Sequence, residues 1–365
     1  MIKPFIGSMR ATLSGPDIGL DLGTANTVAY ERGAGVIVSE PSVVAYDTGT
    51  DAVIAIGNSA KEMEGRATGR IRIVRPLRRG TISDFRGAHA LVGRIVERAM
   101  TARVRVAPRL VASIPGCATD IECKAVETVM RAAGARSCTY VPQAIAAAVG
   151  AGMDIMRIPA QLIVDIGGGT TEIAIIAQMG IIRMLSLQTG GDDLDEAIRQ
   201  KLRAQRFLIG PLTAERLKIE LGYAGRPPGH APAIVKGLDL DAAAPRAREV
   251  PEALIGEGMR DGIDRIVRGI VSVIERTAPD VAADLIETGI TLTGGGACIT
   301  GIAHEIGSRT GVPTTVAPEP LLCVARGAGE ILGSPPLLER LRPHADKITR
   351  WYQSLRIGMR EGYSP

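Results

Sequence analysis

Aromatic residues are scarce in this chain of 365 residues, which holds three phenylalanines, six tyrosines and one tryptophan. Proteins that bind single-stranded nucleic acid without sequence preference stack the bases on aromatic side chains, so we expect no function of that kind. Histidine is almost as rare, with four scattered copies. This scarcity argues against a catalytic triad built on histidine.

Cysteines and long apolar runs are also limited. The five cysteines form no CxxC pair and have no histidine partner at the spacing of a zinc site, a pattern typical of reduced thiols in the cytosol. No apolar stretch approaches the roughly 20 residues that cross a bilayer, and no cleavable signal peptide is evident. We therefore expect a cytoplasmic protein.

The overall charge is small. The formal net charge is +4, with 43 basic and 39 acidic residues, and most of the basic residues are arginines. Without interleaved aromatics, this weak excess does not predict a nucleic-acid partner. The length suits two domains of ordinary size.

The most informative feature is a motif that occurs twice. Ile18–Thr24 reads IGLDLGT, and Leu162–Thr170 reads LIVDIGGGT. In each copy an apolar run, which predicts a buried strand, ends in an aspartate, and glycine and threonine follow. Two copies, each in its own half of the chain, predict two similar domains that hold one phosphate-bearing ligand between them.

The chemistry of the motif favours a phosphate site. Glycines such as Gly167, Gly168 and Gly169 let an oxyanion approach the main chain, where N–H groups of a tight turn point at it. The aspartates, Asp21 and Asp165, would repel a triphosphate unless a hard cation such as Mg²⁺, with its water shell, lay between. The alternative is a pair of strand-to-turn junctions that bind nothing.

Two further segments extend the pattern. Gly289–Ile302 reads GITLTGGGACITGI, where triple glycine after a strand allows a flat ring or ribose to lie on the backbone. In Thr213–Gly222, TAERLKIELG, Thr213 is expected to cap a helix on which Glu215 and Lys218 share a face. These two either contact a nucleotide or form a solvated ion pair; likewise, the triple glycine is either a binding segment or a flexible loop.

Together these segments resemble the actin-like ATPase superfamily and, within it, the MreB-type bacterial actins. The resemblance runs from about residue 17 to about residue 330. It is carried by eight motifs in the family's order: DLGTANT, SEPSVVAY, RPLRRGTISDF, DIGGGTTE, GGDDLDEAI, TAERLKIELG, TLTGGGA and CVARG.

The resemblance implies an α/β fold of the actin-like ATPase type: two duplicated ribonuclease H-like lobes, each with an outer subdomain, and ATP with Mg²⁺ in the cleft. It also implies filaments on the inner face of the cytoplasmic membrane that direct cell-wall synthesis and cell shape. The expected partners are other copies of the chain, that membrane and cell-wall elongation proteins.

The resemblance also assigns the site residues. The metal residues are Asp21 and Asp165, which would hold Mg²⁺ through water, and the catalytic residues are Gln143, Asp165 and Thr170. The nucleotide residues are Gly23, Thr24, Ala25, Asn26, Gly167, Gly168, Gly169, Thr170, Glu215, Lys218, Gly294, Gly295, Gly296 and Ala297.

The motif order also predicts the domain organisation. Lobe I takes residues 1–150 and 325–365, with its outer subdomain at about 41–75. Lobe II takes residues 151–324, with its outer subdomain at about 192–255. Cys138–Gly152, CTYVPQAIAAAVGAG, is expected to be a strand and an alanine-rich helix that cross between the lobes, where a hinge would open the cleft.

One position departs from the family pattern. The family typically has a Glu-Glu-Pro run at this crossing, and the matching residues here are Pro142, Gln143 and Ala144. Glutamine can orient a water molecule but cannot take its proton at neutral pH. We therefore expect a weak ATPase that hydrolyses ATP slowly or only when polymerised. The alternatives are a degenerate scaffold that binds nucleotide without turnover and a small-molecule kinase of the same superfamily.

Both chain ends suggest membrane contact. Ile2, Phe5, Ile6, Met9 and Leu13 follow a helical period with basic residues beside them. A similar stripe near the C-terminus includes Trp351. The alternatives are an unstructured or core-docked leader at the first end and a helix packed on lobe I at the second.

Overall fold

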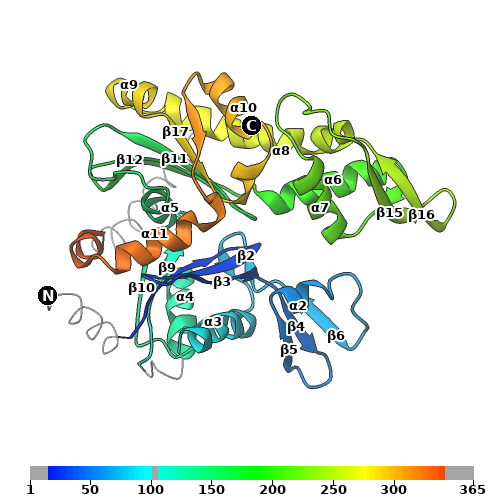
Figure 1. Ribbon diagram of the computed structural model, residues 1–365, viewed down its shortest axis with the longest axis horizontal. Coiled ribbons are helices and arrows are strands. Elements are labelled where there is room, and N and C mark those ends of the chain that lie inside the picture. Colours follow the sequence, from blue (N-terminus) through cyan, green and yellow to red (C-terminus); the bar gives the residue numbers. More distant parts are fainter. Residues whose placement is uncertain (1–14, 101–105, 342–365) are drawn as a thin grey trace, which may run out of the picture.

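The computed structural model describes residues 15–100 and 106–341 (Figure 1). The stripes predicted at the two chain ends lie outside these residues. Among the described residues, no helix is both long enough and apolar enough to span a bilayer. The strands are β1 (Asp17–Leu22), β2 (Asn26–Glu31), β3 (Gly35–Pro41), β4 (Val44–Asp47), β5 (Val53–Ile56), β6 (Ile71–Val74), β7 (Leu77–Arg78), β8 (Thr81–Ile82), β9 (Arg109–Ile114), β10 (Ser137–Pro142), β11 (Gln161–Ile166), β12 (Thr171–Ala177), β13 (Gly180–Leu187), β14 (Phe207–Leu208), β15 (Ala233–Asp239), β16 (Ala244–Val250), β17 (Ile290–Thr293) and β18 (Thr314–Val316).

The α-helices are α2 (Asn58–Lys61), α3 (Phe85–Ala99), α4 (Asp120–Ala132), α5 (Gln143–Gly150), α6 (Gly191–Ala204), α7 (Pro211–Leu221), α8 (Glu252–Glu275), α9 (Pro279–Thr288), α10 (Ile302–Thr310) and α11 (Cys323–Leu332). Two short 3₁₀ helices are η1 (Gly295–Cys298) and η2 (Pro320–Leu322).

Two five-stranded sheets form the centre of the molecule, and they share one topology. The first has the strand order β10-β9-β1-β2-β3 and the second β18-β17-β11-β12-β13. In each, three consecutive strands form an antiparallel meander, and two later strands add in parallel beside the first strand of that meander. The duplication that the repeated motif predicted is therefore present in the sheets themselves.

The repeated motif occupies the same place in both sheets. β1 and β11 each lie in the middle, between a parallel and an antiparallel neighbour. Their apolar residues are buried on both faces, as expected of a strand covered by helices on each side. Asp21 and Asp165 stand near the carboxyl ends of these strands, and the glycine loops follow directly.

Two smaller units extend from the large sheets, and Figure 1 shows them on the same side of the molecule. We call β4, β5, β6 and α2 the first outer subdomain, and α6, α7, β14, β15 and β16 the second. The first large sheet with its helices is called the first lobe, and the second large sheet with its helices the second lobe. The exact domain boundaries given by the sequence remain a prediction.

Helices α5 and α11 lie between the two large sheets (Figure 1). The chain leaves the first sheet through β10, continues into α5 and then enters β11 of the second sheet, so the alanine-rich crossing lies where the sequence predicted it. Side chains of α5 and α11 share one apolar cluster with residues of both sheets, including Val111 and Ile163. Small residues make this packing possible, since a Cβ on Gly327 would lie 1.8 Å from the Ala146 carbonyl oxygen.

Helix starts follow local capping chemistry, with one difference from expectation. The Thr119 hydroxyl and the Glu122 carboxylate form a capping box at α4. At α7 the cap is Gly210 and the first residue is Pro211, so Thr213 lies inside the first turn and is not the cap. Proline is favoured at this first position because its φ is already helical and its missing N–H leaves no donor unpaired.

We expect Gly327→Ala to disrupt the α5–α11 contact, because the added methyl group would overlap backbone atoms that cannot move separately. The cost of such overpacking is about 1–3 kcal/mol. The measurement is the free energy of unfolding from urea titration of the variant and the wild type. Gly93→Ala is the matched control: it lies in α3, and a Cβ there meets nothing within 4 Å. The control should be neutral or more stable by up to about 1 kcal/mol; an equal loss in both variants would contradict the argument.

Candidate nucleotide site

A cavity of about 590 Å³ lies where the ends of β1 and β11 face each other. Its walls come from both lobes and from the second outer subdomain. All predicted site residues except Ala297 line it: Asp21, Gly23, Thr24, Ala25, Asn26, Gln143, Asp165, Gly167, Gly168, Gly169, Thr170, Glu215, Lys218, Gly294, Gly295 and Gly296. The Ala297 side chain instead packs in the hydrophobic core of the second lobe, with 3% of its surface exposed.

The first glycine loop joins β1 to β2 and is held from behind. The Ser42 hydroxyl donates to the Gly23 carbonyl oxygen at 2.6 Å, and the Ser42 N–H donates to the Ala25 carbonyl oxygen at 2.9 Å. The Thr24 hydroxyl oxygen accepts the Gly80 N–H at 3.2 Å. The loop is therefore fixed by its neighbours before any ligand arrives.

The second glycine loop joins β11 to β12 and docks on the start of α6. The Gly191 and Asp192 N–H groups donate to the carbonyl oxygens of Gly167 and Gly168, at 3.0 and 2.8 Å. A Cβ on Gly168 would lie 2.7 Å from the Ala25 Cβ. The two loops are thus in contact across the cavity, and the first N–H groups of α6 hold the second loop in place.

Two carboxylates form the floor between the loops. Asp165 is buried, and its two oxygens accept from the Thr293 hydroxyl at 2.9 Å and from the Gln143 side-chain amide at 2.7 Å. Asp21 is partly exposed to the cavity, and the Ser113 hydroxyl lies 3.4 Å from its Oδ1. Gln143 comes from α5 and Asp165 from β11, so this hydrogen bond joins the first lobe to the second.

The environment of these carboxylates disfavours their charge. Loss of solvation, reinforced by repulsion from Asp165, raises the pKa of Asp21 to about 7. Burial likewise raises the pKa of Asp165, although the bonds from Gln143 and Thr293 oppose the effect. A divalent cation would offset this accumulated negative charge, so the donor set fits Mg²⁺. Because the described residues contain no cluster of three ligating side chains, such an ion would complete its shell with water and ligand oxygens.

The far wall of the cavity carries Glu215 and Lys218, and both are engaged by protein partners. The Lys218 ammonium group donates to Asp195 at 2.8 Å and to the Gly191 carbonyl oxygen at 3.1 Å. The Glu215 carboxylate lies 2.6 Å from the Lys61 ammonium group, which belongs to the first outer subdomain. Two residues on the predicted face of α7 therefore belong to two different ion pairs.

The triple glycine forms the adjoining wall. Gly294 has a φ of +79°, a conformation that favours glycine, and a Cβ there would lie 2.4 Å from the Ile166 carbonyl oxygen. Gly295 starts the 3₁₀ helix η1 rather than a flexible loop. Apolar side chains of Ile219 and Leu321 also line the cavity, and apolar lining of this kind suits a flat ring.

Sequence reasoning missed two hydroxyl residues at this site, Ser113 and Thr293. Each lies at the carboxyl end of a strand, β9 or β17, that runs parallel to β1 or β11. Parallel strands bring their carboxyl ends to one edge, so a hydroxyl residue ending a buried run was an available signal. Choosing these two strands required the sheet order, which no single motif provides.

Comparisons with known proteins agree with this geometry. A model of the MreB/Mbl protein family matches residues 15–339. The chain is 36% identical to the cell shape-determining protein MreB of Escherichia coli K12, over 91% of this chain and 96% of that protein. It is 35% identical to the cell shape-determining protein Mbl of Bacillus subtilis, over 87% and 95%.

Solved structures give the same result. MreB5 of Spiroplasma citri bound to AMPPNP has a TM-score of 0.84 and 32% identity, covering 91% of this chain and 99% of that one. The ADP-bound form of the same protein has a TM-score of 0.83 and 33% identity, covering 87% and 96%. The two duplicated lobes with a cavity between them are the actin-like ATPase fold. Within that class, the chain belongs to the MreB/Mbl protein family, which supports a role as a bacterial actin.

We expect Asp21→Asn to stabilise the ligand-free protein at pH 8 and to leave it unchanged near pH 4. The pKa of Asp21 is about 7 in the folded chain, above the roughly 3.9 of an unfolded aspartate. The folded state therefore binds more protons between these values, and its stability falls as the pH rises through them. The measurement is thermal unfolding of the variant and the wild type from pH 4 to pH 8, without nucleotide or Mg²⁺. Each kcal/mol of added stability should raise the unfolding temperature by about 2–4 °C.

Asp261→Asn is the control for this prediction, since Asp261 is an exposed carboxylate on α8 outside the cavity. It should unfold like the wild type at every pH. An Asp21→Asn variant that unfolds at a lower temperature than the wild type at pH 8 would show that the charge of Asp21 does not destabilise the folded protein.

Proposed function

We propose that this chain binds ATP with Mg²⁺ in the cavity between its lobes and polymerises into filaments. The filaments lie on the inner face of the cytoplasmic membrane, work with cell-wall elongation proteins and direct cell shape. The observation that carries the nucleotide site is the contact between the two glycine loops above a pair of carboxylates. The nucleotide-bound structures of Spiroplasma citri MreB5 support the choice of ligand.

Each part of the cavity has a matching part of the ligand. The two glycine loops suit the phosphates. Glu215 and Lys218 suit the sugar hydroxyls, and the apolar wall beside Gly294–Gly296 suits the base. Bound Mg²⁺ supplies charge neutralisation for the phosphates, and Asp21 and Asp165 would hold it through water.

Hydrolysis is proposed to be slow, and Gln143 is the reason. Its side-chain amide already donates to Asp165, and an amide cannot accept a proton from the attacking water at neutral pH. This observation also favours the second candidate, a scaffold that binds nucleotide without turnover. Thr170, buried at the end of the second loop, is the proposed second hydroxyl contact to the phosphates.

Assembly and membrane contact rest on membership of the family. The actin-like fold of the chain supports the proposal of self-association, and the relatives named cell shape-determining proteins support the proposed role in cell shape. The peripheral location on the inner membrane face is part of the same proposal. It depends on chain ends that lie outside the described residues.

We expect the wild-type chain to release or absorb heat on binding Mg·ATP, and to lose this signal in EDTA, because the carboxylate floor needs the cation. Mg·GTP is the second titrant, since the cavity walls do not fix the base. In the same samples, high-speed sedimentation and negative-stain imaging on anionic lipid should reveal filaments only with nucleotide. Well-folded protein that binds neither nucleotide would overturn the proposed function.

Asp165→Asn and Asp261→Asn form the matched pair for this experiment. The first removes one carboxylate from the floor, and the second removes an exposed carboxylate elsewhere. Only Asp165→Asn should weaken binding and sedimentation. If both variants bind Mg·ATP as tightly as the wild type, the metal assignment is wrong.

Phosphate release should rise in Gln143→Glu by roughly tenfold or more, because a carboxylate restores a proton acceptor beside the attacking water. Both the variant and the wild type must first be shown to bind Mg·ATP, so that a difference in phosphate release does not arise from a difference in binding. The measurement is single-turnover phosphate release with saturating protein, which keeps repeated nucleotide exchange out of the measured rate.

Gln143→Ala is the control, since it also removes the hydrogen bond to Asp165 but adds no base. It should release phosphate no faster than the wild type. Equal rates in Gln143→Glu and the wild type would mean that residue 143 does not limit turnover, and no release from either would favour the scaffold.

A further inference from the structure

One ion pair joins the two outer subdomains beside the cavity. The Lys61 ammonium group, at the end of α2, contacts both carboxylate oxygens of Glu215, on α7, at 2.8 and 2.6 Å. Within residues 15–100 and 106–341, no other ion pair connects these two subdomains. Both side chains are about three-quarters buried, with 24% and 26% of their surface exposed.

The pair stands at the rim of the nucleotide cavity rather than inside it. Glu215 lines the cavity wall, whereas Lys61 is not among the residues that line it. Seen from the cavity, Lys61 therefore lies behind the Glu215 carboxylate. Any movement that separates the two outer subdomains must break this ion pair.

Further charges at the rim favour the same closed position. Arg75 of the first lobe forms an ion pair with Glu64 at 3.1 Å. Burial opposes the charge of Arg75, but nearby carboxylates outweigh this effect and raise its pKa. Besides Glu64, those carboxylates are Asp192 and Glu215 of the second outer subdomain. Cations of one lobe thus face carboxylates of the other along the rim.

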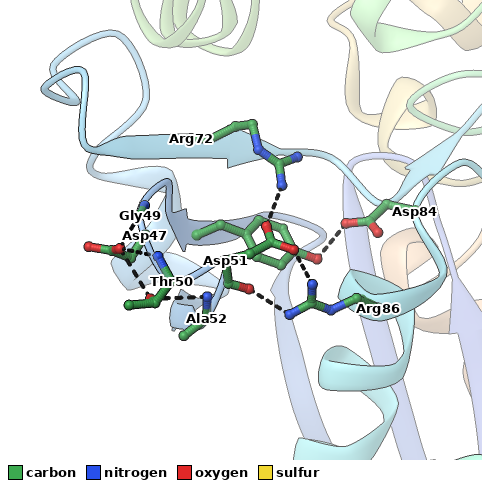
Figure 2. Close-up of polar contacts among 9 residues, drawn as sticks. Asp47, Gly49, Thr50, Asp51, Ala52, Arg72, Asp84 and Arg86 are labelled. Atoms are coloured by element: carbon green, nitrogen blue, oxygen red, sulfur yellow. Dashed lines mark hydrogen bonds and ion pairs between the residues drawn. The ribbon is translucent and has the colours of Figure 1, made fainter.

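The first outer subdomain, which carries Lys61, is tied to the first lobe by the polar contacts drawn in Figure 2. The Arg86 guanidinium group, on α3, bonds to the side chain and to the backbone oxygen of Asp51, and Arg72 donates to the same carboxylate at 3.0 Å. The Tyr46 hydroxyl donates to Asp84 at 2.5 Å, just before α3. The first outer subdomain is therefore fastened to the first lobe.

The guanidinium groups of Arg72 and Arg86 also lie over the Tyr46 ring, at 4.7 and 5.6 Å from its centre. On the other side, α7 packs against α6 and α8 in the core of the second lobe. Each member of the Lys61–Glu215 pair is thus fixed to a large body. Separation of the pair requires movement of one lobe relative to the other about α5 and α11.

We propose that Lys61 and Glu215 form a latch that holds the cleft closed and sets the rate at which nucleotide enters and leaves. The inference rests on the proposed nucleotide site and adds Lys61, which contacts no ligand, as a gating residue. The pair is formed in a chain without ligand, so the latch must open for entry as well as for exit. Weakening it should raise both rates by a similar factor and leave the dissociation constant nearly unchanged.

The test uses stopped-flow fluorescence with N-methylanthraniloyl-ADP and Mg²⁺ on the full chain. Lys61→Met keeps the length of the side chain and removes its charge. We expect association and dissociation rate constants to rise together by about three- to tenfold, the effect of losing one partly buried ion pair. Salt should speed exchange in the wild type but much less in the variant, because the screened attraction is already absent.

Two variants and a second measurement keep the test decisive. Lys61→Arg retains the charge and should exchange nucleotide like the wild type, and Lys124→Met, an exposed lysine on α4, should also have no effect. A rise in the dissociation rate alone, with weaker binding, would assign Lys61 to ligand contact and overturn the latch. Unchanged rates in Lys61→Met would overturn it as well.

Failure of the proposed function gives a different result. If the wild type does not bind the fluorescent nucleotide, the nucleotide site itself is wrong. The latch is then decided without ligand by small-angle X-ray scattering, in which Lys61→Met should have a larger radius of gyration than the wild type and Lys124→Met. Equal radii would overturn the latch.

Discussion

The structure depends on the close packing of α5 against α11 between the two large sheets. Ala146 and Gly327 bring the helix backbones so near that no larger side chain fits at the glycine. This contact fixes the distance between the sheets and turns the ends of β1 and β11 toward each other. The cavity, the meeting of the glycine loops and the crowding of Asp21 and Asp165 all follow from it.

The sequence was sufficient for the duplicated architecture because the chemistry of the repeated motif is local. A buried strand, an aspartate and a glycine turn follow one another within nine residues in Leu162–Thr170, and each property can be read from residue type. Ala297 is the one assigned residue that does not line the cavity, and its role remains a prediction. It follows three glycines that line the cavity, but the 3₁₀ helix η1 turns its side chain into the core.

Contacts between distant segments were beyond the reach of these patterns. Thr293 and Gln143 hold the two oxygens of Asp165, and neither the strand order nor the approach of α5 to β11 is encoded in any single motif. Lys61 was missed likewise, since 154 residues separate it from Glu215. A spacing rule found Glu215 and Lys218 on one face of α7, but only the fold shows that they serve different ion pairs.

The contacts of Gln143 and Lys61 lie at different distances from the axis about which the lobes would rotate. Gln143, the first residue of α5, donates a hydrogen bond to Asp165, and a rotation about that helix moves these atoms little. Lys61 and Glu215 lie on the outer subdomains, far from the axis, where the same rotation separates them widely (Figure 1). A modest attraction at the rim therefore resists opening more effectively than a stronger bond near the hinge. For this reason the chain can keep the hydrogen bond between Gln143 and Asp165 at the floor of the site, while a single, partly exposed ion pair governs the exchange of ligand.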